Sequence, residues 1–311
     1  MFGERNREGD TGSGTKNAIA VNPPSAKEML FMTTAVIPET VRKLLASQPI
    51  ELPIFHPVAI KLQRMLSDYD FTVDEVAHVA TEDQSLATQM LKMANSPMYM
   101  GRTKVATIKE AVIRLGAQQV INLAIAASQA AVHTSQNEAL NRYMKQLWLH
   151  SHGSALGARW LAHACGMRGV ADETYLAALL HDVGKLYLLK AIERLVDAGV
   201  ISSMFDEELI ADIFEVMHVE QGYRLMLHWN FPTMYCDVVR DHHIEQWDVV
   251  NKMLTIVRFV NLACHRVGLG LIHEPELALS ATREAEVLDL SDFQIAELEA
   301  LLEESREAGF A

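Results

Sequence analysis

Apolar residues recur at helical spacing along most of the 311-residue chain. Val58, Leu62 and Met65 fall at i, i+4 and i+7, which places them on one face of a helix. Start and stop signals separate such runs: the capping-box pairs Thr72–Glu75 and Thr107–Glu110, the terminator Asn95-Ser96-Pro97, and Gly116. We find no run with the period-2 alternation of a strand. The pattern therefore predicts an all-α fold, a two-lobed multi-helix bundle.

The same signals divide the chain. We expect a short helix over 29–45, five helices within 52–132, then helices over 140–165, 172–180, 185–198, 206–217, 219–228, 232–241 and 249–267, and a last helix from Ser291, capped with Gln294. The predicted divisions are a disordered tail at 1–25, an N-terminal helix or linker at 26–47, a main domain at 48–270 with lobes at 52–132 and 139–270, and an acidic C-terminal helical extension at 271–311.

Charge and cysteine usage exclude several classes of protein. The net charge of −13 argues against nucleic-acid binding, which depends on Lys and Arg at phosphates. No run reaches the 18 apolar residues of a membrane helix, and the N-terminus lacks the apolar core of a signal peptide. Three separated cysteines, Cys165, Cys236 and Cys264, suit a reducing compartment. We therefore expect a cytoplasmic protein without a membrane or nucleic-acid partner.

Histidines cluster in the second predicted lobe, where 11 of the 13 lie between His133 and His273. Neutral imidazole with an anionic carboxylate is a ligand set for divalent cations such as iron, manganese or zinc. The ordered subset that we predict as a metal site is His150, His181, Asp182, His218, His242 and His243. Five of the other histidines of this region, His152, His163, His228, His265 and His273, are assigned to ordinary core or surface positions.

Small residues follow two of the predicted ligands on the same helix face: Gly153, Ser154 and Gly157 after His150, and Gly222 after His218. Such a face allows a neighbouring backbone or a ligand to approach closely. After His181-Asp182, Gly184 permits a turn, and Lys185 supplies a cation that suits a phosphate.

The order of these residues resembles the HD superfamily of metal-dependent phosphohydrolases, with His181-Asp182-Val183-Gly184-Lys185 similar to its central motif. The chain resembles more specifically the HDOD domain, the HD-related output domain. Six stretches in order carry that resemblance: Leu52-Pro53-Ile54-Phe55, Leu91-Lys92-Met93-Ala94-Asn95-Ser96-Pro97-Met98-Tyr99, Ala111-Val112-Ile113-Arg114-Leu115-Gly116, Trp148-Leu149-His150-Ser151, Trp229-Asn230-Phe231-Pro232 and His242-His243.

The resemblance covers about residues 48–270 and implies an HDOD domain with an HD-like second lobe. As a family, HDOD proteins are bacterial signalling modules, most of them without demonstrated enzymatic activity. They are often fused to other signalling domains, but the flanks here are short, so we expect a stand-alone module.

Two departures from the catalytic pattern bear on activity. Asn261 stands where an active HD phosphohydrolase has its final Asp ligand, and an amide is a weak neutral ligand. The Gly-Tyr-Pro signature of cyclic-di-GMP phosphodiesterases is also missing after His242-His243.

Four interpretations follow. The departures favour a signal-transduction protein that binds a partner protein or small ligand without catalysis. A residual phosphohydrolase is the alternative, with metal held by His150, His181 and Asp182 and with Lys185 at the phosphate. A third interpretation is a non-hydrolytic binder of a cyclic dinucleotide or nucleotide. In the fourth, Asp182 bonds His150 and His181 without metal and holds the lobes together.

Overall fold

The computed structural model describes residues 39–48, 55–68, 71–96, 99, 101–201 and 207–308. All of them lie in one compact unit, Ile37–Ala311. The chain is 74% helical, and the described residues contain no strand, which confirms the all-α prediction. The predicted disordered tail at 1–25 lies outside the described residues, as does the predicted linker before residue 39.

The first helices are short and follow the predicted signals. They are α2 (Glu39–Ala46), α3 (Pro57–Asp68), α4 (Val73–Ala80), α5 (Gln84–Ala94), α6 (Ile108–Leu115) and α7 (Ala117–Val132). Gly116 separates α6 from α7 at a φ of 86°, a left-handed value that favours glycine. The later helices are α8 (Glu138–Ala164), α9 (Ala171–Leu180), α10 (Val183–Asp197), α11 (Glu207–His228), α12 (Thr233–Asp241), α13 (Lys252–Val267), α14 (Arg283–Leu288) and α15 (Asp292–Ala308), with 3-10 turns η1 (Arg168–Val170) and η2 (Leu279–Ala281).

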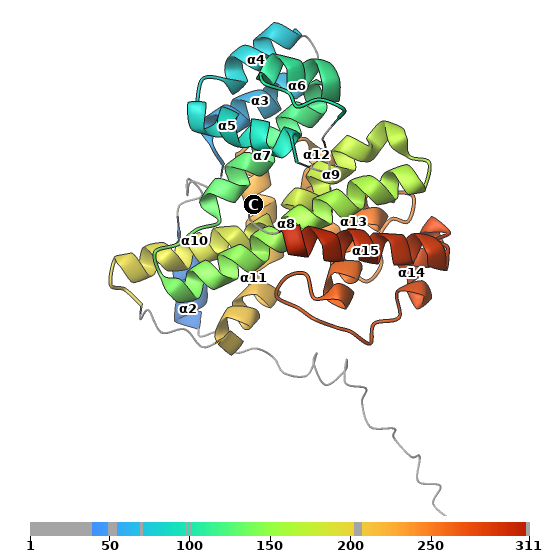
Figure 1. Cartoon of the computed structure of the whole chain (residues 1–311). Helices are drawn as coiled ribbons and strands as arrows, with labels where there is room; N and C mark the ends of the chain where they lie inside the picture. Colours follow the sequence, from blue (N-terminus) through green and yellow to red (C-terminus); the bar gives the residue numbers. More distant parts are fainter. Residues whose placement is uncertain are drawn as a thin grey trace, which may run out of the picture. The chain divides into compact units, whose positions relative to one another are not determined.

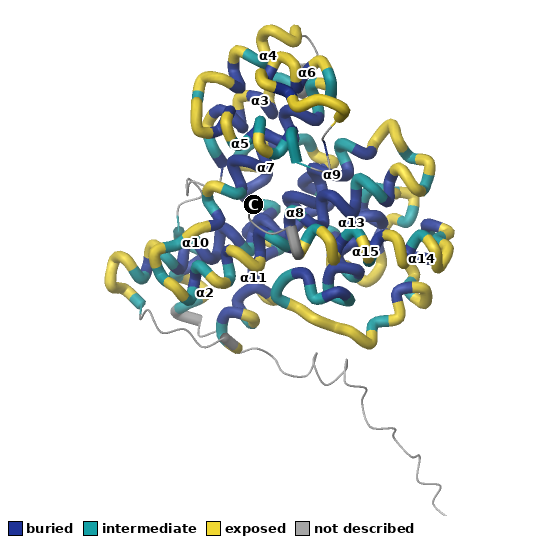
Figure 2. The backbone as a smooth tube through the Cα atoms, in the orientation of Figure 1, coloured by how far each residue is buried: buried dark blue, intermediate teal, exposed yellow. Residues whose placement is uncertain are grey.

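Helix α7 forms the centre of the N-terminal group. It contacts α3, α5 and α6, while α4 pairs with α6 (Figure 1). Every residue from Gln119 to Gln129 is buried, so this Ala-rich helix is covered all round (Figure 2). α7 also contacts α9, where the side-chain amide of Asn122 donates to the Asp172 carbonyl at 2.7 Å. The N-terminal helices are thereby joined to the helices that carry the predicted site.

The 27-residue helix α8 organises the C-terminal group and packs against α9, α10, α13 and α15 (Figure 1). Its small face lets two neighbours come close. A Cβ on Gly153 would overlap the Leu269 side chain, and a Cβ on Gly157 would lie 3.0 Å from Val260. The small residues after His150 therefore admit α13 and the segment that follows it.

Two of the three predicted capping boxes are complete. Thr72 and Glu75 exchange both hydrogen bonds at the start of α4. Ser291 and Gln294 do the same before α15, since each side-chain oxygen accepts from the other's backbone N–H. Thr107 caps α6, but the carboxylate of Glu110 accepts from Ala106 at 2.8 Å and misses the cap residue itself. The third box is therefore only half formed.

The predicted break between helices 206–217 and 219–228 is wrong. α11 runs without interruption over Glu207–His228, because no Pro and no N-cap residue stands beside residue 218 and the helix continues through Gly222. His218 lies inside the helix, and its imidazole bonds the Phe214 carbonyl one turn back. The sequence patterns also missed α14, which Thr282 caps and which buries Ala285 and Leu288. None of the described helices is both long and apolar enough to cross a membrane.

Candidate metal centre

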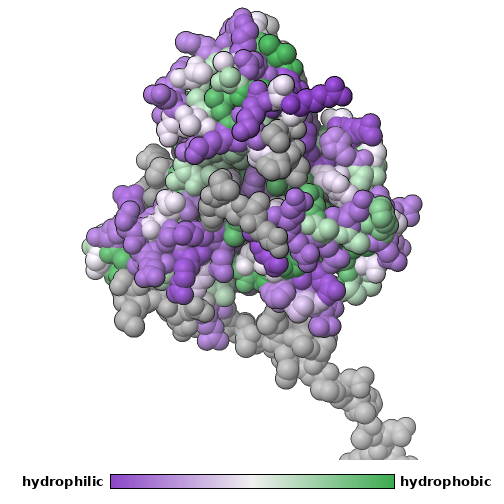
Figure 3. All heavy atoms as spheres, in the orientation of Figure 1, coloured by the Kyte–Doolittle hydropathy of each residue, from purple (hydrophilic) through white to green (hydrophobic). Residues whose placement is uncertain are grey.

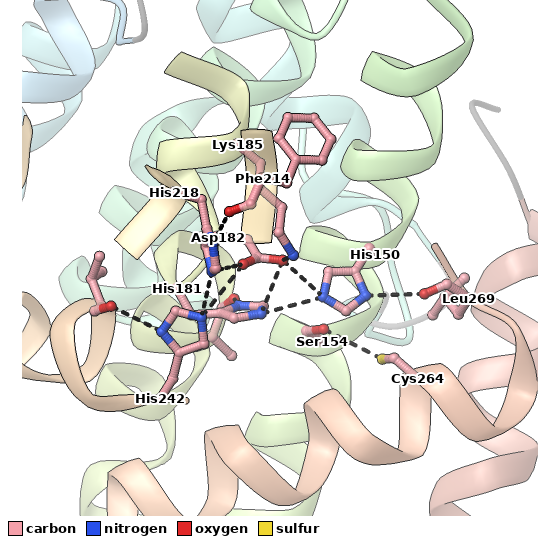
Figure 4. A network of polar contacts seen from close by, with 12 residues as sticks. His150, Ser154, His181, Asp182, Lys185, Phe214, His218, His242, Cys264 and Leu269 are labelled. Carbon is pink, nitrogen blue, oxygen red and sulfur yellow. Dashed lines mark hydrogen bonds and ion pairs between the residues drawn. The ribbon is translucent and has the colours of Figure 1, made fainter. Parts of the chain in front are cut away.

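The five predicted histidine ligands gather around the carboxylate of the sixth ligand, Asp182. Figure 4 shows four of them, His150, His181, His218 and His242, around Asp182. The six ligands come from four places in the fold: His150 from the middle of α8, His181 and Asp182 from the turn between α9 and α10, His218 from α11, and His242 and His243 from the end of α12. Five of the six are buried, and His243 is exposed. Whether the six bind a metal stays a prediction, but the structure brings them together.

The turn at His181-Asp182 is set by its flanking helices. Leu176 and Leu180 at the end of α9 are fully buried and anchor one side. α10 then begins directly, with the Lys185 N–H on the Asp182 carbonyl at 2.8 Å. Gly184 lies inside the first turn of α10, so it does not form the turn that we predicted for it. It sits instead where α10 meets α11, and a Cβ there would meet the His218 carbonyl.

Each oxygen of the Asp182 carboxylate faces its own pair of imidazoles. Nε2 of His150 and Nε2 of His181 lie 3.4 Å and 3.5 Å from Oδ2. Nε2 of His218 and Nε2 of His242 lie 3.6 Å and 3.5 Å from Oδ1. The ligand atoms accordingly form two groups that share Asp182, one with His150 and His181 and one with His218, His242 and His243.

The other nitrogen of four imidazoles is held by a backbone carbonyl (Figure 4). The Nδ1 partners are Leu269 for His150 at 3.0 Å, Ala178 for His181 at 2.7 Å, Phe214 for His218 at 2.5 Å and Val239 for His242 at 2.9 Å. A carbonyl only accepts, so each Nδ1 carries a proton, and whenever the ring is neutral its Nε2 presents a lone pair to the centre. Metal-binding histidines are oriented in this way.

This arrangement requires positive charge at its centre. Two facing Nε2 lone pairs do not hydrogen bond, yet His150 and His181 meet at 3.3 Å and His218 and His242 at 3.4 Å. Among the described residues no hydrogen-bond donor reaches Oδ1 of Asp182. A divalent cation at either group would satisfy these atoms. The donor set therefore fits a metal, with His150, His181 and Asp182 around one oxygen and the remaining ligands around the other.

Protonation offers a partial substitute. Burial lowers the pKa of His181 and of His218 to about 3 each, so both are neutral at pH 7. Burial also acts against a charged His150, but its contacts with Asp182 and Cys264 prevail and raise the pKa of His150 to about 10. A protonated His150 supplies one positive charge beside Asp182. This charge supports the interpretation in which the two residues form an ion pair without metal.

Lys185 supplies a second cation. Its Nζ lies 2.6 Å from Oδ2 of Asp182. Although burial disfavours a charged carboxylate, the Lys185 ammonium holds the pKa of Asp182 well below its usual range. Asn261 is the residue that the resemblance predicts in place of an Asp ligand. Its Oδ1 atom is buried and has no hydrogen-bond partner among the described residues.

A cavity beside the cluster is very small. Its volume is about 10 Å³, the space of one water, and its lining is His150, Asp182, Lys185, His265, Leu147, Leu271 and Ile272. The ring of His265 lies 6.1 Å from that of His150. The spacing of the histidines did not indicate that His265 lies beside the cluster. Only the packing of α13 on α8 brings it next to His150.

His152 lies away from the cluster, as its place on the helix predicts. It stacks on Trp148 at a ring distance of 5.1 Å, and His133 contacts the same indole at 5.6 Å. Its Nδ1 is buried and has no hydrogen-bond partner among the described residues. His133, which is buried, and His152, which is partly buried, thus lie outside the candidate metal centre.

Acid should destabilise the protein through these two residues. Burial lowers the pKa of His133 and of His152 to about 4, whereas the pKa of a histidine in the unfolded chain is about 6.5. Below that pH the unfolded state takes up protons that the folded state refuses, so stability present above about pH 6.5 is lost as the pH falls toward 4. We expect His152→Phe to lose less stability than the parent between about pH 7 and about pH 4.5 in urea unfolding. His163→Phe, at an exposed position, serves as control, and an equal loss in His152→Phe and the parent would contradict the assignment.

The fold and the site define an all-helical protein with a buried histidine–aspartate cluster that could bind a divalent metal. The chain belongs to the HDOD domain family, whose model matches residues 52–245. A Treponema pallidum protein of uncharacterized function is 25% identical over 197 residues, which are 62% of this chain and 38% of that protein. The chain therefore matches well under half the length of that relative.

Solved structures share the fold. An HDOD domain protein of unknown function from Geobacter sulfurreducens has 24% identity and a TM-score of 0.68, over 87% of this chain and 96% of that one. A candidate metal-dependent phosphohydrolase from Shewanella amazonensis has 19% sequence identity and a TM-score of 0.64, and the match covers 86% of this chain and 96% of that one. A candidate signal transduction protein from Marinobacter aquaeolei has 21% sequence identity and a TM-score of 0.62, and the match covers 86% of this chain and 63% of that one. At these identities the likeness establishes the fold alone.

Proposed function

We propose that this protein is a signalling module whose histidine–aspartate cluster binds a divalent metal without turning over a phosphorylated substrate. One observation carries the proposal: six candidate ligands lie beside a cavity of only about 10 Å³. Pockets that take small organic ligands measure roughly 300–1,000 Å³. A phosphate ester or a cyclic dinucleotide does not fit this cavity, while an ion and a water do.

A metal here acts on conformation. Its ligands would come from α8, the α9–α10 turn, α11 and α12, so that a bound ion would connect several helices of the fold. An ion that binds the folded arrangement and not the unfolded chain stabilises it, by about 2.7 kcal/mol at a hundredfold excess over its Kd. Metal occupancy would then determine how rigid the C-terminal group of helices is when it presents its surface to a signalling partner.

Hydrolysis is the second candidate function. Its support is Lys185, whose ammonium lies against Asp182 and also lines the cavity. A bound metal supplies a water of lowered pKa, and Lys185 would stabilise charge on a phosphate. This use requires the residues that line the cavity to move, because the cavity beside the cluster holds no more than a water.

The test compares metal content with turnover in the same preparations. We expect the purified protein, reloaded with manganese, iron or zinc, to hold metal as measured by mass spectrometry, and to hydrolyse neither bis(p-nitrophenyl) phosphate nor cyclic-di-GMP. A His181→Ala, Asp182→Ala variant should hold none. Metal-dependent turnover that disappears in this variant would replace the proposal with the hydrolase function, and equal, negligible metal in both proteins would leave the cluster structural.

A further inference from the structure

The end of α12, which carries His242 and His243, is held by an arginine from another helix. Arg258 on α13 donates from Nη1 to the His242 carbonyl at 2.7 Å. The same nitrogen lies 3.5 Å from the Asp241 carbonyl. His242 is thus fixed at two points, by Arg258 on its carbonyl and by the Val239 carbonyl on its ring.

Arg258 is itself held from two further sides. Its Nε and Nη2 both lie 2.9 Å from Oε1 of Glu284, which is buried at 5% exposure in α14. Its guanidinium stacks on the Trp247 ring at 4.1 Å, within the range of cation–π contacts. The Trp247 indole in turn donates to Thr255 at 3.1 Å. All three guanidinium nitrogens and one guanidinium face therefore have partners.

We propose that Arg258 is a positioning residue for the half of the cluster formed by His218, His242 and His243. Its contacts lie on the backbone of His242, so it sets where that imidazole points without touching the centre. The planar guanidinium makes these contacts in fixed directions, which a lysine ammonium does not reproduce. Trp247 and Glu284 both lie C-terminal to residues 52–245, the part of the chain that the family model matches. A segment beyond that match therefore supports the half of the cluster that contains His242. The consequence for metal affinity rests on the proposed function; the positioning itself does not.

The first experiment uses metal-free protein and histidine ring nitrogen NMR. Arg258→Gln is combined with Glu284→Gln, because a buried carboxylate left alone could unfold the chain. We expect the ring signals of His242 and His243 to shift or broaden while those of His150 and His181 stay unchanged. The matched control is Arg283→Gln, since Arg283 is exposed and lies over the same Trp247 ring at 4.8 Å but has no bond to His242. Unchanged signals throughout, or equal shifts in all four histidines, would overturn the proposal.

The second experiment titrates cobalt(II) into the same proteins by calorimetry. Loss of a residue that orients a metal ligand typically costs roughly 10- to 100-fold in affinity, and we expect a loss of that size for the double variant and for Arg258→Lys. The loss should disappear in a His242→Ala background and persist in a His150→Ala background. A loss that persists after His242→Ala contradicts positioning through His242. A parent that binds no cobalt contradicts the proposed function, and the metal-free spectra still decide the role of Arg258.

Discussion

Replacement of Asp182 by asparagine should abolish divalent-metal binding by the whole cluster. The substitution keeps the size of the side chain but removes the negative charge that both groups of imidazoles share. It also leaves the Lys185 ammonium, only 12% exposed in its side chain, without its carboxylate. Removing one partner of a buried ion pair typically costs about 3–5 kcal/mol. We expect metal content at background and an affinity at least roughly 100-fold lower.

Mass spectrometry and calorimetry of the purified protein measure this effect. The matched control is Asp172→Asn, which breaks a half-exposed ion pair with Arg159 on the neighbouring helices and should keep its metal. Metal bound equally by the parent and Asp182→Asn would mean that the carboxylate is not a ligand, and that the proposed function is wrong.

Alanine at Gly184 should have the largest effect on stability. Its Cβ would collide with the His218 carbonyl and lie 2.8 Å from the Gly222 backbone nitrogen. Both neighbours are backbone, which does not turn aside as a flexible side chain does, so α10 and α11 must separate. Overpacking costs about 1–3 kcal/mol where side chains yield, and we expect at least the upper value here. Because His218 moves with α11, metal affinity should fall as well.

Urea unfolding monitored by circular dichroism tests this prediction. Gly169→Ala is the control, because a Cβ there meets nothing within 4 Å and should change the free energy of unfolding by less than about 0.5 kcal/mol. An unchanged unfolding midpoint for Gly184→Ala would show that the two helices do not approach as closely as described.

Local signals carried most of the secondary structure. The capping pairs at Thr72 and Ser291 and the break at Gly116 act within a few residues, so the sequence predicts them directly. The break predicted at residue 218 had no such local signal, since no Ser, Thr, Asp, Asn or Pro stands next to that residue, and α11 continues through it. Gly184 shows a related limit. A glycine in the sequence indicates either a turn or a close approach, and only the packing of α10 on α11 distinguishes the two.

The candidate site divides in the same way. The order of the histidines around His181-Asp182 was visible in the sequence, and with it the resemblance to the HDOD family that the match over 52–245 confirms. Two contacts were not visible in the sequence. His150 meets Leu269, 119 residues later, and Arg258 meets Glu284, 26 residues later. Nor could the sequence predict that Leu271 and Ile272 line the small cavity. The sequence by itself determined the helices and the ligand types, because these depend on neighbours along the chain. Tertiary structure alone decided how the ligands are oriented and how little space they leave, because both depend on side chains that meet only when distant helices pack together.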